Sequence, residues 1–254
     1  MNNNLDYLNR VYLRIDLDKI CNNIKEVIKK VGDDTKVMAV VKADAYGHGA
    51  IEVSKALSEI GTYGFAVATV GEALALRRAG ITKPILILDF VFPNQFETII
   101  RNDIMLTIFR YEIAKELNEA AEQMGTTVHI HIKVDTGMGR IGFIPDEESV
   151  DEIRRISQLP NVEIDGIFTH FACADEADKT SMNKQFEKFK SFVKKLEEIG
   201  INIPIKHVCN SAAIIDSNDK FLNMVRSGII TYGLYPSEFV HKDRLHIEPA
   251  MELH

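Results

Sequence analysis

The sequence has few cysteines and no long apolar stretch. Its three cysteines, Cys21, Cys173 and Cys209, are odd in number and scattered through 254 residues, so they predict no disulfide framework and indicate a reducing cytoplasm. No run of about 18 apolar residues occurs, and the polar segment 1–10 has neither the basic start nor the apolar core of a signal peptide. We therefore expect a cytoplasmic protein that neither enters nor crosses a membrane.

The sequence also lacks an excess of positive charge and any linker-like segment. Its formal net charge is -7, which gives no general attraction to nucleic acid or to anionic membranes, so we expect neither as a partner. A bound anion would need a local site. No Pro/Gly/Ser-rich or low-complexity tract divides the chain, and its length suits a single α/β domain with a sizeable core.

What the sequence does contain is an alternation of short apolar runs with amphipathic segments. Helical spacing is clear, for example, at Val53, Ala56, Leu57 and Ile60. Eightfold strand–helix alternation favours an α/β fold of the (β/α)8, TIM-like barrel type over an open sheet. The eight expected strands are 36–41, 64–68, 84–88, 104–108, 128–134, 163–169, 205–208 and 222–225.

The segment before the first of these strands has a different pattern. Residues 11–17 alternate apolar and polar side chains, as in a half-exposed strand, and residues 17–31 have the apolar face of an amphipathic helix. We expect the strand to belong to a sheet other than the barrel.

Polar side chains close several of the apolar runs, at the end of a barrel where active sites lie. They include Lys42, an amine suited to Schiff-base chemistry, although a lone lysine at a strand end is more often a surface residue. Asn210–Ser211 and 227–229 follow the last two strands, where barrels commonly bind phosphate, although these residue types also form plain turns.

Two other motifs are weaker. Residues 137–142 satisfy the pattern GxGxxG, but 143–145 do not begin a helix, so we reject a dinucleotide site. His129 with His131, or His170 with Cys173 and Asp175, could in principle bind a metal. Neither set has the spacing of a closed tetrahedral site, and we expect none.

The stretch 42–49, KADAYGHG, resembles the attachment signature for pyridoxal 5'-phosphate (PLP) in alanine racemases, which are fold-type III PLP enzymes. The resemblance continues through 131–142, 166–171, 207–213, 225–229 and 232–236, and so covers essentially the whole chain. Two departures are Ser227, where the family often has proline, and the end of the chain at His254, where family members continue into a β-rich domain.

The resemblance implies a role for each strand-end residue. Lys42 would carry PLP and act as the base for the D-enantiomer, and Arg140 would bind the substrate carboxylate, supported by a carbamylated Lys133. Arg226 would lie by the pyridine nitrogen and keep it unprotonated, supported by His207. The remaining cofactor-binding residues would be Tyr46, His170, Asn210, Ser211, Gly228 and Ile229.

The implied function is interconversion of L- and D-alanine, which supplies D-alanine for peptidoglycan, by a homodimer. Alternatives are a racemase of serine, lysine or another amino acid, and a non-catalytic PLP-homeostasis barrel. We expect residues 1–17 to include a strand that pairs with the β domain, residues 18–245 to form the PLP barrel, and residues 246–254 to begin the connection. Because the family's second base is a tyrosine of that domain in a partner subunit, we expect residues 1–254 alone to bind PLP but to racemise poorly.

Overall fold

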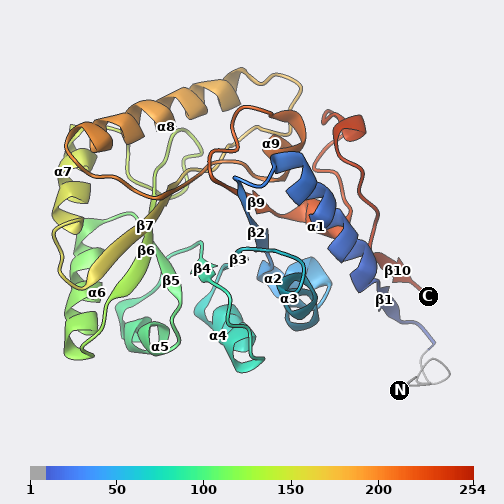
Figure 1. Cartoon of the computed structure of the whole chain (residues 1–254), viewed down its shortest axis with the longest axis horizontal. Coiled ribbons are helices and arrows are strands. Elements are labelled where there is room, and N and C mark those ends of the chain that lie inside the picture. Colours follow the sequence, from blue (N-terminus) through green and yellow to red (C-terminus); the bar gives the residue numbers. More distant parts are fainter. Residues whose placement is uncertain (1–9) are drawn as a thin grey trace.

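The computed structural model describes residues 10–254, and its centre is a closed barrel of eight parallel strands (Figure 1). Each strand pairs with the next along the chain, and β9 closes the barrel against β2. The predicted (β/α)8 barrel is thereby confirmed. The strands are β2 (Lys36–Val40), β3 (Gly64–Val67), β4 (Ile85–Ile87), β5 (Met105–Ile108), β6 (Val128–Lys133), β7 (Val162–Phe168), β8 (Ile205–His207) and β9 (Met224–Ser227).

Helices cover the outside of the barrel (Figure 1). None of them, within residues 10–254, is both long and apolar enough to span a membrane. Most of segment 1–10, where we expect no signal peptide, lies outside the described residues. The helices are α1 (Leu17–Val31), α2 (Lys42–Gly47), α3 (Ala50–Ser58), α4 (Val70–Arg78), α5 (Phe96–Arg101), α6 (Tyr111–Gln123), α7 (Glu147–Ile156), α8 (Thr180–Glu198) and α9 (Ser211–Asp216), with short 3-10 turns at Pro93–Gln95, η2 (Ile229–Tyr232) and Lys242–Arg244.

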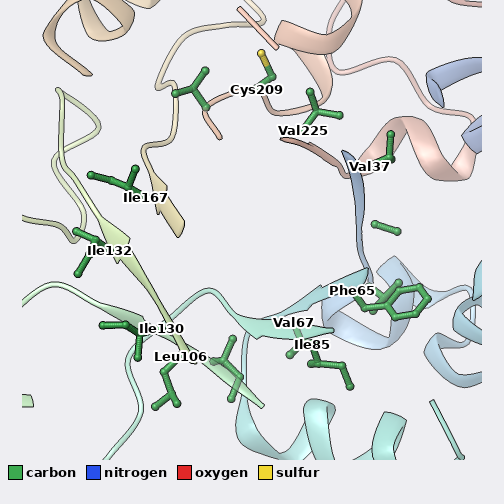
Figure 2. Close-up of a cluster of buried hydrophobic side chains, with 14 of the residues drawn as sticks. Val37, Phe65, Val67, Ile85, Leu106, Ile130, Ile132, Ile167, Cys209 and Val225 are labelled. Atoms are coloured by element: carbon green, nitrogen blue, oxygen red, sulfur yellow. The ribbon is translucent and has the colours of Figure 1, made fainter. Parts of the chain in front are cut away.

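The core has two layers because side chains alternate along each strand. Outward-facing residues such as Val37, Phe65 and Ile132 pack between the barrel and its helices (Figure 2). A second cluster, which includes Met38 and Met224, belongs to the opposite strand faces and fills the barrel interior. The strands therefore form a packed scaffold that fixes the side chains at their ends.

Helix α1 follows the prediction from its sequence pattern. Its buried residues Ile20, Ile24, Val27 and Val31 recur at helical spacing, and the Asp16 side chain accepts a hydrogen bond from the Lys19 amide at 3.1 Å. This cap begins the helix directly after the preceding strand. The strand is consequently shorter than predicted, β1 (Leu13–Ile15) rather than 11–17.

Strand β1 also has a partner that the sequence did not indicate. It lies beside β10 (Met251–Leu253) in Figure 1 and pairs with it antiparallel. In this register Arg14 is opposite Glu252. Part of the segment that we expected to be only a connection is thus a strand, and one edge of β1 is occupied within the chain. The division into domains stays a prediction.

The last barrel strand is shifted from its predicted position. We expected a strand at 222–225, but Leu222 has a positive φ of 53° and β9 spans Met224–Ser227. Arg226 and Ser227 therefore lie within the strand rather than after it. The rule that polar residues end a buried strand fails here because the Arg226 guanidinium finds enough acceptors to be buried, as described below.

Candidate active site

A cavity of about 430 Å³ opens at the carboxyl ends of the barrel strands. It brings together residues from the carboxyl ends of seven of the eight barrel strands, which are far apart in sequence. All predicted site residues except His207 line it: Lys42, Tyr46, Lys133, Arg140, His170, Asn210, Ser211, Arg226, Gly228 and Ile229. His207 lies beneath, in contact with Arg226. Whether each residue has its expected role stays a prediction.

Lys42 begins a left-handed turn. The four residues after it, 43–46, have φ between 51° and 55° and ψ between 35° and 49°, so α2 has the opposite hand from an ordinary helix. This conformation costs roughly 1–2 kcal/mol for each non-glycine residue. The Nζ of Lys42 has no hydrogen-bond partner within residues 10–254, so the amine is left free at the cavity wall.

Neighbouring elements hold this turn in place. The Glu72 carboxylate on α4 accepts hydrogen bonds from the amides of Ala43 and Ala68, both at 2.7 Å. Beneath the turn, the Tyr232 hydroxyl donates to the Val40 carbonyl at 2.8 Å, and its ring stacks on His48 with 4.5 Å between centroids. Contacts made outside the motif therefore compensate its unfavourable backbone conformation.

Beside the turn, two hydroxyl groups and a glycine form a site suited to an anion. A Cβ built on Gly228 would lie 3.2 Å from Ser211 Oγ and 3.5 Å from Tyr46 Oη, so the glycine leaves room between two hydroxyl groups. Burial raises the pKa of Tyr46, which keeps its hydroxyl a donor at neutral pH. These residues fit a phosphate group.

Two of the expected anion contacts are modified by the structure. The Gly228 amide already donates to Ser211 Oγ at 3.0 Å, so the hydroxyl proton of Ser211 and the Ile229 amide are the better-placed donors. The Asn210 side chain caps α9 by accepting from the Ala213 amide at 3.1 Å. Asn210 lines the cavity, but its oxygen serves the helix.

Arg226 is buried at the floor of the cavity and is well paired. One terminal nitrogen donates to His207 Nδ1 at 2.7 Å, and the other donates to the Thr169 carbonyl at 2.8 Å. Burial lowers the pKa of Arg226 to about 10, so the guanidinium stays charged at neutral pH. A fixed cation therefore faces any ring or anion above it.

The contacts of Arg226 determine the protons on two buried histidines. Because Arg226 is the donor, His207 Nδ1 is the acceptor, and the Nε2 proton of His207 points to His131 Nδ1 at 2.8 Å. Burial and the nearby Arg226 charge lower the pKa of His131 to about 3 and that of His207 well below its usual range, so both rings are neutral. The outer nitrogen of His131 is buried without a partner among the described residues.

The chain of hydrogen bonds from Arg226 through His207 to His131 depends on Gly166, which faces the His131 ring. A Cβ on Gly166 would lie 2.4 Å from two atoms of that ring. We expect Gly166→Ala to lower the free energy of unfolding by about 1–3 kcal/mol through overpacking, measured by urea denaturation. Gly71→Ala on α4 is the control, because the nearest atom to a Cβ there is Thr69 Oγ1 at 3.9 Å, and it should stabilise by up to about 1 kcal/mol. Equal effects would contradict the assignment.

Two further cations reach the cavity from β6 and the loop after it. Lys133 is buried and donates to the carbonyls of Val134 at 2.9 Å and Ile141 at 3.1 Å. Burial, followed by the charge of Arg226, lowers the pKa of Lys133 to about 7. The Arg140 guanidinium has no hydrogen bond or ion pair within residues 10–254, which leaves it available to a carboxylate.

Three supporting residues were missed by sequence reasoning. Glu72 could have been noticed as the last residue of the capping box that begins at Thr69, but its reach to Ala43 could not. Gln185 is a polar residue in the apolar stripe of α8, and it bonds the His170 carbonyl at 3.1 Å and the Ala172 amide at 2.9 Å. Phe168 stacks on His207 with 4.6 Å between centroids.

The structure also shows what residues 137–142, rejected above as a dinucleotide motif, do instead. Residues 137–142 form a loop, and the next helix, α7, begins only at Glu147. Glycines in this loop serve backbone geometry: Gly142 has a φ of 138°, and a Cβ there would lie 2.5 Å from the Asp135 amide nitrogen. The loop instead carries Arg140 to the cavity.

Comparison with known proteins agrees with this geometry. The family described as "Alanine racemase, N-terminal domain" matches residues 15–236. An alanine racemase of Methanococcus maripaludis is 54% identical over 243 residues, and one of Clostridium tetani is 49% identical over 247 residues. The chain spans 65% and 64% of the lengths of these two relatives, and they cover 96% and 97% of the chain.

Solved structures give the same result. A Clostridium difficile alanine racemase in complex with cycloserine is 46% identical, has a TM-score of 0.94, and covers 96% of this chain, which in turn spans 67% of that protein. A Bacillus anthracis alanine racemase with bound L-Ala-P is 36% identical with a TM-score of 0.90. The chain therefore belongs to the alanine racemase family, of which it contains the amino-terminal barrel domain.

Proposed function

We propose that this chain is the PLP-binding barrel of an enzyme that interconverts L- and D-alanine, supplying D-alanine for peptidoglycan and acting in the cytoplasm as a homodimer. The observation that carries the proposal is the cavity itself. It places a free lysine amine, two hydroxyl groups beside a glycine and two guanidinium groups at one mouth. Its family membership and the names of its relatives support the same reaction.

When bound, PLP supplies an electron sink that eases removal of the α-proton of an amino acid. Lys42 anchors the cofactor and then removes or returns that proton on one face of the substrate. Tyr46, Ser211 and Ile229 hold the phosphate, and Arg140 orients the substrate carboxylate. Neutral His170, whose pKa burial and nearby cations lower to about 3, packs by the ring without adding charge.

The reaction is tested directly by supplying the holoenzyme with single enantiomers of alanine, serine and lysine and measuring the opposite enantiomer by chiral chromatography. We expect alanine to be racemised with the highest kcat/KM. Preference for serine or lysine would support the alternative racemases, and PLP binding without turnover of any amino acid would support a non-catalytic PLP barrel.

Arg226 is expected to control the proton on the pyridine nitrogen. Since a guanidinium cannot give up its proton near neutral pH, the ring nitrogen beside it stays unprotonated and the electron sink stays weak. In the holoenzyme, Arg226→Glu should lower racemisation by roughly 10²–10³-fold and raise the proportion of transamination. The ratio of pyruvate to D-alanine formed from L-alanine measures this partition.

Arg226→Lys is the control for that experiment, because it keeps a buried cation while losing the forked geometry. It should lower the rate but leave the ratio of pyruvate to D-alanine close to that of the parent enzyme. A ratio that is unchanged in Arg226→Glu would show that Arg226 does not govern the ring nitrogen.

Lys133 is expected to react with carbon dioxide. Its pKa of about 7 means that a substantial fraction of the amine is neutral near pH 7, and the fraction rises as the pH increases. The neutral amine adds to CO2, forming an N–C bond and releasing one proton, and the resulting anion would face Arg140. With ¹³C-labelled bicarbonate, we expect a carbamate resonance by NMR that Lys133→Met lacks and Lys42→Ala retains. A resonance that persists in Lys133→Met would refute the assignment.

A further inference from the structure

A second group of chemically active side chains lies at the other end of the barrel. His129 is near the start of β6, and Glu163 and Asp165 are on the neighbouring strand β7. His129 is four residues before Lys133, which corresponds to about 13 Å along a strand. The group is thus separate from the cavity already described.

The three side chains converge on one point. His129 Nδ1 lies 3.1 Å from Asp165 Oδ1 and 3.9 Å from Glu163 Oε2. One ligand atom from each residue lies within 4.8 Å of the other two. A divalent cation with tetrahedral ligands at ~2.0–2.2 Å holds them about 3.3–3.6 Å apart. Because the Glu163 side chain is 64% exposed, a small rotation closes this difference.

An irregularity in the sheet produces the convergence. Ile130 pairs with Ile164, but the next residue, His131, pairs with Gly166, so Asp165 has no partner on β6. Such a bulge re-aims side chains. Here it leaves both carboxylates beside His129, while His131 turns to His207. The two histidines that the sequence grouped together therefore belong to different sites.

The charge around the group is unbalanced. Within residues 10–254, no lysine or arginine lies within 4 Å of either carboxylate, whose ion-pair partner is His129. Although burial opposes the charged form, the hydrogen bond to Asp165 and the charges of Asp165, Glu163 and Asp103 together raise the pKa of His129. Burial and the Asp165 charge raise the pKa of nearby Tyr63. The local charge is therefore that of Asp165, Glu163 and Asp103, while the Lys36 ammonium lies over the Tyr63 ring, 4.6 Å from its centroid.

We propose that His129, Glu163 and Asp165 bind a divalent transition-metal ion of the Zn²⁺ type, with water completing its coordination. One imidazole and two carboxylates form a donor set that such ions accept. The ion replaces the proton that His129 otherwise shares with Asp165, so binding weakens as the pH falls and His129 becomes protonated. The sequence groups His129 with His131 and gives no sign of Glu163 and Asp165 beside it, so no metal site was expected.

Equilibrium dialysis of the full chain against Zn²⁺ near neutral pH tests the proposal. We expect saturable binding of one ion per chain and a Zn²⁺-dependent rise in Tm. Both effects should be lost in His129→Gln and in Asp165→Asn. His246→Gln is the matched control, since His246 is also exposed beside one carboxylate, Glu248, at 3.9 Å, and it should bind like the parent.

Two results of the dialysis would contradict the proposed metal site. Absence of saturable binding overturns the proposal, and so does binding that survives His129→Gln or Asp165→Asn, because the ion would then be held elsewhere, for example by a cysteine. The two variants change partly exposed side chains, 39% exposed for His129 and 25% for Asp165, so folding is checked by their melting without metal, which should match that of the parent.

Discussion

Replacing Lys42 by alanine is expected to abolish covalent attachment of PLP. The parent chain, incubated with PLP, should show a visible absorption band, and borohydride should fix the cofactor on the peptide that contains Lys42. The variant should show neither, although Tyr46, Ser211 and Ile229 still offer donors to the phosphate. Mass spectrometry of the digested chain measures the label.

The cavity contains its own control for this experiment. Lys133 is a second lysine in the same cavity, and its pKa of about 7 leaves a substantial fraction of its amine neutral, and so nucleophilic, at neutral pH. Its Nζ, however, is bonded to two carbonyls, whereas that of Lys42 is free. Lys133→Met should therefore retain the label on Lys42. Recovery of the label on Lys133 would overturn the assignment of Lys42.

The polypeptide of residues 1–254, tested alone, is expected to exchange the α-proton of D-alanine without forming L-alanine. Racemisation needs a base on each face of the substrate, and loss of one base costs typically 10²–10⁴-fold. Of the tyrosines within residues 10–254, only Tyr46 lines the cavity, on the phosphate side. Tyr232 is committed to the Val40 carbonyl.

Incubation in deuterium oxide measures this difference. D-alanine should gain deuterium at Cα with its configuration retained, and L-alanine should remain unlabelled; Lys42→Ala should abolish the exchange. Mixing the polypeptide with the separately made carboxyl-terminal domain of a curated relative should restore racemisation. Full racemase turnover by residues 1–254 alone would refute the two-base proposal.

Much of the fold was predictable because its signals are local. Each barrel strand is a short apolar run bounded by polar residues, so all eight were placed to within two residues. The site residues were predictable for another reason: motifs such as 42–49 carry a family resemblance. Once the fold placed the strand ends at one mouth, these residues had to meet.

The features that were missed depend on contacts between distant segments. Nothing in the alternating pattern of residues 11–17 indicates that Met251–Leu253 pairs with this segment. Arg226 can lie inside a strand only because the Thr169 carbonyl and His207 Nδ1 accept hydrogen bonds from its guanidinium. The bulge at Asp165 likewise exists in the pairing of β6 with β7 and not in either strand by itself.

The left-handed turn after Lys42 limits how far the signature can be transplanted. Four L-residues of that hand cost roughly 4–8 kcal/mol in total, a sum that a short peptide cannot recover. A synthetic peptide of residues 36–50 would consequently not present the lysine as the barrel does, and an antibody raised against it would recognise a different shape. Grafting KADAYGHG onto another barrel would require Glu72, Tyr232 and the glycine at 228 as well. What would have to be transferred is the three-dimensional cluster of residues and not only the eight-residue segment 42–49.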